Sequence, residues 1–172
     1  MNWRQDEFER VAMPHSRSLL RFACRLTPHD QAAAEDLVQE TLLQAWRKFH
    51  QFEAGTNARA WLFRILVNAG NGRIRKERAR LRTVPLDDTH PAAPADPEAL
   101  EVMQVLDQLS VEHRAVLMLS VVEGFTSREV AEILQIPQGT VMSRLSRARQ
   151  VLRDKLRDES DTPIRRPLAA RT

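Results

Sequence analysis

The sequence has one cysteine, five glycines and no tyrosine in 172 residues. With Cys24 alone, neither an intramolecular disulfide nor a zinc cluster built from thiolates can form. No apolar run approaches the roughly 18–20 residues needed to cross a bilayer. The first residues also lack the basic-then-apolar pattern of a secretion signal. We therefore expect a cytoplasmic protein without membrane insertion. The five histidines are scattered without metal-ligand spacing, so we expect neither a metal nor another cofactor.

Helix is the structure that the remaining pattern favours. Hydrophobic residues make up 42% of the chain, and they recur mainly at three- and four-residue spacings, as in amphipathic helices. Four of the nine prolines fall within residues 83–97, a stretch too polar and too interrupted to build a core. We predict an all-α protein: two small helical domains joined by a flexible linker, with a helix-turn-helix in the second. The predicted parts are a domain over 1–82, the linker over 83–97, a domain over 98–157 and a disordered tail over 158–172.

In the first domain, individual residues predict where helices begin and end. Pro14 should break the first run, and Asp30 is a good N-cap for the helix that follows. Residues 68–72, Asn-Ala-Gly-Asn-Gly, hold two glycines and two asparagines, so we predict a loop there. The predicted helices cover 6–12, 15–26, 31–50, a segment from about 57, and a basic helix over 73–82.

The second domain is predicted to open near Pro97 and Glu98, because proline is favourable in the first turn of a helix. Ser110 can cap a helix over 111–123 that ends at Gly124. Thr126 and Glu129 match a capping box, in which each side chain satisfies a free backbone N–H. The box predicts a short helix over 127–134, followed by a turn and a last helix over 138–157.

A short helix, a four-residue turn and a longer helix rich in arginine form the pattern of a helix-turn-helix. Val141 and Leu145, four residues apart, should face the core. Arginine can bond bidentately to guanine in the major groove, and serine or threonine can bond phosphates or bases. The residues left on the outer face of the last helix are Thr140, Ser143, Arg144 and Arg147.

Charge is unevenly distributed although the net charge is only +3. Residues 59–82 carry eight basic and one acidic side chain, and residues 133–157 carry six and one. The intervening residues 83–132 carry two basic and ten acidic side chains. Like-charged blocks are often solvated helix faces, but they are also typical of two phosphate-facing surfaces on two modules. Charge alone leaves both interpretations open.

Three segments resemble one protein family. Residues 34–49, AEDLVQETLLQAWRKF, resemble conserved region 2.2 of the extracytoplasmic-function sigma factors, the fourth group of the sigma-70 family. Residues 60–65, AWLFRI, resemble region 2.3, and residues 139–149 resemble region 4.2. The resemblance covers about residues 5–157, with the segments in the family's order. It implies a non-enzymatic factor that binds core RNA polymerase and directs promoter-specific initiation through the −10 and −35 elements.

The resemblance also implies partners and roles for individual residues. Asp36, Gln39 and Glu40 match the face with which the family docks on the β′ clamp helices of the polymerase. The resemblance implies a second polymerase contact, with the β flap. Residues 68–72 match the segment that captures a base flipped from the −10 element. The implied −10 contacts are Asn68, Gly70, Asn71, Arg73, Arg75 and Lys76. The implied −35 contacts are Ser143, Arg144 and Arg147, with Thr140 and Arg128 on phosphates. An anti-sigma factor is the implied regulator.

Other classes of protein remain as alternatives. A conventional helix-turn-helix regulator would bind duplex DNA without polymerase, but its sensor domain has no use for the basic stretch at 68–82. A sigma mimic that sequesters an anti-sigma factor would not need the outward arginines. An enzyme is the weakest hypothesis, because no nucleophile lies in a recognisable pairing with a base. Trp46 and Trp61 are predicted to be core residues rather than base-stacking platforms.

Overall fold

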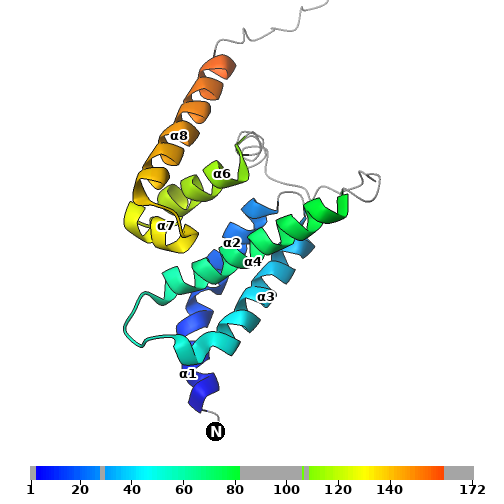
Figure 1. The fold of residues 1–172 in the computed structure, drawn as a ribbon, viewed down its shortest axis with the longest axis vertical. Helices are drawn as coiled ribbons and strands as arrows, with labels where there is room; N and C mark the ends of the chain where they lie inside the picture. The colour runs from blue at the N-terminus through cyan, green and yellow to red at the C-terminus, as the bar shows by residue number, and fades with distance from the viewer. Residues whose placement is uncertain (1–2, 28–29, 82–105, 107–108, 161–172) are drawn as a thin grey trace, which may run out of the picture.

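The computed structural model describes residues 3–27, 30–81, 106 and 109–160. Every regular element within these ranges is a helix, and the helices form two groups joined through a direct contact (Figure 1). The all-α, two-domain prediction is therefore confirmed. The predicted linker over 83–97, the predicted helix start at 97–98 and most of the predicted tail lie outside the described residues.

Two helices open the first group and meet at the predicted proline break. α1 spans Trp3–Ala12 and α2 spans Ser16–Leu26, with a 3-10 turn, η1, over Met13–His15 between them. Pro14 lies in the first turn of η1, where its missing N–H costs nothing. The inward side chains of α2, which include Leu19 and Phe22, are fully buried.

α3 spans Gln31–Lys48 and ends in a 3-10 turn, η2, over Phe49–Gln51. The predicted cap at Asp30 is confirmed, since its carboxylate accepts a hydrogen bond from the Ala33 N–H at 2.8 Å. Trp46 is partly buried and packs against the core, with its ring edge-on to Phe8 at 5.3 Å between centroids.

The loop predicted at residues 68–72 is wrong. α4 runs without interruption over Ala58–Leu81, and the predicted basic helix is its C-terminal part. Tertiary packing overrides the low helix propensity here. A Cβ on Gly70 would lie 3.6 Å from a methyl of Leu37 and 3.7 Å from a methyl of Leu26. These are ordinary packing distances, so the side of α4 that carries Gly70 packs against α2 and α3, and burial of the neighbouring Ala69 also supports the helix.

The second group begins with α6, Val111–Leu117, which Ser110 caps as predicted through the His113 N–H. The helix then widens into a π turn, η3, over Met118–Val122, and the chain leaves it at Gly124, whose φ is +70°. α7 spans Ser127–Leu134 and α8 spans Gln138–Ser160. α8 passes the predicted end at 157, because no glycine or proline follows before Pro163.

One hydrophobic core includes buried residues of both groups. Phe63 on α4 and Phe125, between η3 and α7, are buried with their rings edge-on at 5.2 Å. α7 packs against α4, as its place beside the first group in Figure 1 shows. We call this arrangement, in which the two helical groups share a core, the closed arrangement.

Candidate nucleic-acid interface

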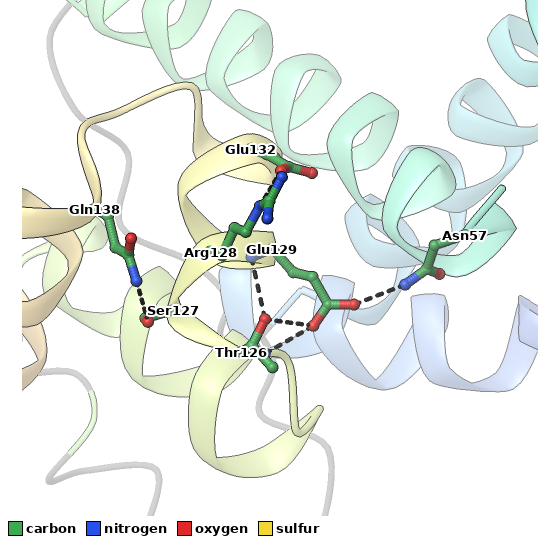
Figure 2. Close-up of polar contacts among 7 residues, drawn as sticks. All are labelled: Asn57, Thr126, Ser127, Arg128, Glu129, Glu132 and Gln138. Carbon is green, nitrogen blue, oxygen red and sulfur yellow. Dashed lines mark hydrogen bonds and ion pairs between the residues drawn. The ribbon is translucent and has the colours of Figure 1, made fainter.

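The helix-turn-helix formed by α7 and α8 has the local geometry that its sequence predicted. The capping box is complete: the Thr126 hydroxyl accepts from the Glu129 N–H, and the Glu129 carboxylate accepts from the Thr126 N–H at 2.8 Å (Figure 2). Gln135 ends α7 in the left-handed conformation, with φ at 56° and ψ at 45°. A non-glycine residue there costs on the order of 1 kcal/mol. The turn thus has defined geometry at some cost in stability.

The outer face of α8 is available to a ligand. Val141 and Leu145 are buried, as predicted, and they fix which side of α8 faces away from α6 and α7. On that outer side Ser143 and Arg147 are exposed, and Thr140 and Arg144 are half-buried. The Ser143 hydroxyl donates to the Thr140 carbonyl at 3.0 Å. In helix-turn-helix proteins, residues near the N-terminal end of the second helix contact base edges in the major groove.

Arg128 does not belong to the α8 face. It lies on α7, and its Nε donates to the Glu132 carboxylate at 3.3 Å in an exposed i,i+4 pair (Figure 2). Such pairs contribute about 0.3–0.5 kcal/mol, so the guanidinium can leave Glu132 for a phosphate at little cost.

The acidic surface on α3 is exposed. Asp36, Gln39 and Glu40 follow each other at helical spacing, and all three are solvent-exposed. Glu40 accepts from the Gln44 amide at 3.0 Å. Asp36 lies 3.5 Å from Arg73 Nη2, and Arg73 Nη1 donates to the Ala33 carbonyl at 3.2 Å. A residue predicted to bind polymerase is thus paired with one predicted to bind −10 DNA, which the sequence did not indicate.

The residues predicted for the −10 element do not form one surface. Asn68 and Asn71 are exposed on α4, three residues apart, whereas Gly70 is buried against α2 and α3 and has no surface to offer DNA. Arg73 is half-buried next to Asp36. Arg75 and Lys76 lie on α4, and their side chains are outside the described residues.

A separate groove of about 260 Å³ opens between α1 and the segment from η2 to α4. It is partly aromatic, and no sequence pattern predicts it because its walls are distant along the chain. Trp3, which is 72% exposed, forms part of its rim. The lining residues are Trp3, Arg4, Glu7, Phe49, His50, Phe52 and Ala54.

Two titratable groups have shifted pKa values near these surfaces. The backbone N–H of Thr126, followed by its hydroxyl, lowers the pKa of Glu129, because both donate to the charged carboxylate. Burial, followed by the charge of Arg59, lowers the pKa of His15. Within the described residues, no group of three His, Cys, Asp or Glu side chains could hold a metal ion. The helices of the same ranges include none that is long and apolar enough to span a membrane.

Comparison with known proteins identifies the family. The family model described as "Sigma-70 region 2" matches residues 11–80, and the model "Sigma-70, region 4" matches residues 99–152. The chain is 40% identical over 156 residues to the ECF RNA polymerase sigma factor SigL of Mycobacterium tuberculosis, covering 84% of this chain and 85% of SigL. The chain belongs to the extracytoplasmic-function sigma factors. It is a sigma factor that directs promoter-specific initiation by core RNA polymerase.

Further relatives support the same family. The chain is 35% identical over 145 residues to SigM of M. tuberculosis, covering 83% of this chain and 73% of SigM. Among solved structures it resembles the sigma factor RpoE of Bartonella quintana, solved with the anti-sigma factor NepR, at 33% identity and a TM-score of 0.76. That match covers 88% of this chain and 97% of the other. CnrH, solved with the cytosolic domain of CnrY, matches at 28% identity and a TM-score of 0.68, over 92% and 91% of the chains.

Proposed function

We propose that this sigma factor divides initiation among three surfaces. The acidic face of α3 docks on the β′ clamp helices, α4 contacts the −10 element, and the outer face of α8 enters the major groove at the −35 element. We also assign a contact with the β flap to the second domain. The observation that carries the proposal is the exposure of Ser143 and Arg147 on α8 just after the helix-turn-helix turn, above the buried Val141 and Leu145. An acidic and amide face on α3 suits a basic coiled coil.

On α4 the proposed DNA surface is a helix face rather than a loop. Asn68 and Asn71, on the exposed side of α4, supply donors and acceptors for a strand of the −10 element. Arg73 lies apart from them, paired with Asp36, and must leave that carboxylate to bind a phosphate. Base capture requires a surface on which an unstacked base can rest, and aromatic side chains serve that purpose. We assign this role to the groove that Trp3 and Phe52 help to line, with Arg4 as the nearby cation.

The closed arrangement cannot be the one that binds a promoter. The nominal positions of the −35 and −10 elements are about 25 base pairs apart, which is about 85 Å along B-form DNA. α4 and α8 have 24 and 23 residues, so laid end to end they would reach only about 70 Å. Because α7 joins them in direct contact, the −10 and −35 surfaces lie closer together than the promoter requires. The two domains must therefore separate on the polymerase.

The regulator that we propose is an anti-sigma factor that binds the closed arrangement. The sigma factor RpoE, solved with the anti-sigma factor NepR, matches 88% of this chain, and CnrH, solved with the cytosolic domain of CnrY, matches 92% of it. We further propose that the factor acts in the cytoplasm, inserts no segment of its own into a membrane, and has no catalytic activity.

Two substituted proteins, each the control for the other, test the division of labour. The first carries Arg144→Ala and Arg147→Ala, and the second carries Glu40→Lys with Gln39→Lys. We expect the α8 variant to bind core polymerase normally but to lose −35-dependent run-off transcription by roughly a hundredfold, since each lost bidentate contact costs about 1–3 kcal/mol. The α3 variant should bind core polymerase weakly on every promoter. Normal transcription by the first, or normal polymerase binding by the second, contradicts the respective assignment.

A further inference from the structure

We propose that the contact between α4 and the segment from η3 to α7 is an intramolecular latch, which keeps the free sigma factor closed and lowers its affinity for core RNA polymerase. The latch joins residues about 60–70 positions apart in the sequence, and it needs no partner protein. Its residues are Asn57, Arg59 and Phe63 from the first domain, and Glu123, Phe125 and Glu129 from the second.

The centre of the latch is a largely buried ion pair. Arg59 Nη2 bonds the Glu123 carboxylate, and Nη1 donates to the Glu123 carbonyl at 2.7 Å. The Glu123 side chain is only 1% exposed, whereas that of Arg59 is 29% exposed. The guanidinium also lies over the Phe125 ring at 4.3 Å and the Phe63 ring at 5.3 Å. Arg59 is thus the one described cation that neutralises the Glu123 carboxylate.

The energetics of this pair suit a contact that must open. Removal of a carboxylate from water is costly, and the ion pair offsets most of that cost rather than exceeding it. Glu123 Oε1 is buried with no hydrogen-bond partner among the described residues. Separation of the domains returns that oxygen to water. The ion pair therefore favours the closed arrangement but still allows the domains to separate.

Two further polar contacts lie beside the ion pair. The Asn57 amide donates to Glu129 Oε1 at 2.8 Å, from the N-cap of α4 to the capping box of α7 (Figure 2). At the other end of the interface, Arg114 on α6 donates to the Arg25 carbonyl at 3.4 Å. This carbonyl lies in the last turn of α2, where a cation is favoured. The interface therefore has polar contacts in addition to the central ion pair and its two aromatic rings.

The latch has a consequence for polymerase binding that rests on the proposed function. A promoter-competent factor is open, so polymerase binds the open fraction productively. The apparent dissociation constant is then the intrinsic one divided by that fraction. Any substitution that frees the two domains should tighten polymerase binding, although it removes contacts from the protein.

The test uses the full chain with two substitutions and a matched control for each. Arg59→Gln leaves Glu123 buried without its cation, and Arg64→Gln makes the same change on the exposed side of α4. Asn57→Asp keeps the α4 cap but sets a carboxylate against Glu129, and Gln51→Glu adds the same charge on exposed η2. Small-angle X-ray scattering measures the radius of gyration of each free protein, circular dichroism checks its helix content, and titration measures its affinity for core polymerase.

We expect Arg59→Gln to shift the closed–open equilibrium towards open by on the order of a hundredfold, since an unpaired buried charge is strongly unfavourable. Its radius of gyration should rise at unchanged helix content, and its affinity for core polymerase should rise roughly tenfold or more. Asn57→Asp should act in the same direction, and both controls should match the parent protein.

Equal radii for the variants and their controls would overturn the latch. A larger radius with unchanged polymerase affinity would overturn its inhibitory role and leave only a structural contact. If the radius rises but no protein, the parent included, binds core polymerase, the sigma assignment fails together with the inhibitory role. In every case, the radius of gyration alone tests whether the contact keeps the two domains together.

Discussion

The Glu129 side chain accepts three hydrogen bonds at the junction of the two domains. Its Oε2 accepts from the backbone N–H and the hydroxyl of Thr126, both at 2.8 Å, and its Oε1 accepts from the Asn57 amide. All of these donors favour the charged carboxylate, which lowers its pKa. A carboxyl whose pKa is lower in the folded state than in the unfolded chain stabilises the fold above its unfolded pKa. That contribution is lost as the pH falls through the folded pKa.

We therefore expect the Glu129→Gln substitution to lower the free energy of unfolding by an amount that depends on pH. Glutamine fits the same capping box but carries no charge to favour. At neutral pH the variant should have the smaller free energy of unfolding, measured by urea titration. The gap should close as the pH falls below 4.5, the ordinary value for glutamate. A gap of constant size down to acid pH would show that the charge of Glu129 contributes nothing.

At the scale of elements, α4 is the helix that organises the first domain and reaches the second. It carries Asn57 at its cap, Arg59 and Phe63 in its first turns, and Asn68 and Asn71 further along its exposed side. Its continuity depends on packing rather than propensity, because glycine in a helix interior costs about 0.5–1 kcal/mol relative to alanine.

Gly70→Ala is expected to stabilise the protein by about 0.5–1 kcal/mol. The added Cβ would make ordinary contacts of 3.6 and 3.7 Å with Leu37 and Leu26, and it would reduce the freedom of the unfolded chain. Gly72→Ala has open space around its Cβ and should give a similar gain. The measurement is the midpoint of urea unfolding. A loss of stability in both variants would mean that residues 68–72 depart from helix in solution.

The elements that local chemistry determines could be predicted from sequence. Pro14, Asp30, Ser110 and the Thr126–Glu129 box each act on the next few residues, and each helix boundary near them was predicted within about three residues. Gly70 was misjudged because its environment comes from Leu26 and Leu37, which are distant in sequence.

In the candidate site, too, local sequence patterns predict some features, and contacts between distant residues determine the others. The α8 face follows from periodicity, because Val141 and Leu145 define its buried side. The pairing of Asp36 with Arg73 and that of Arg59 with Glu123 join positions 37 and 64 residues apart. No spacing rule indicates which of many charged side chains will meet over such separations, so these contacts required the structure.

At the scale of the whole molecule, the shared core makes the two domains one unfolding unit in the closed arrangement. The rings of Phe63 and Phe125 meet across the domain boundary, and α7 packs on α4. The parent protein should therefore unfold in one calorimetric transition whose van't Hoff and calorimetric enthalpies agree. Arg59→Gln should split it into two transitions, one for each domain. Two transitions in the parent protein would show that the shared core does not couple the domains.

The double use of Glu129 limits how evolution can adjust domain closure. The same carboxylate completes the first turn of the helix-turn-helix and receives the Asn57 amide. A mutation at Glu129 that loosens closure also damages the DNA-binding motif, and selection acts against it for the second reason. Asn57 faces a milder constraint, because serine, threonine and aspartate also cap helices. Descendants of this gene can therefore tune how readily the factor opens by mutation on the α4 side, while the α7 side stays fixed.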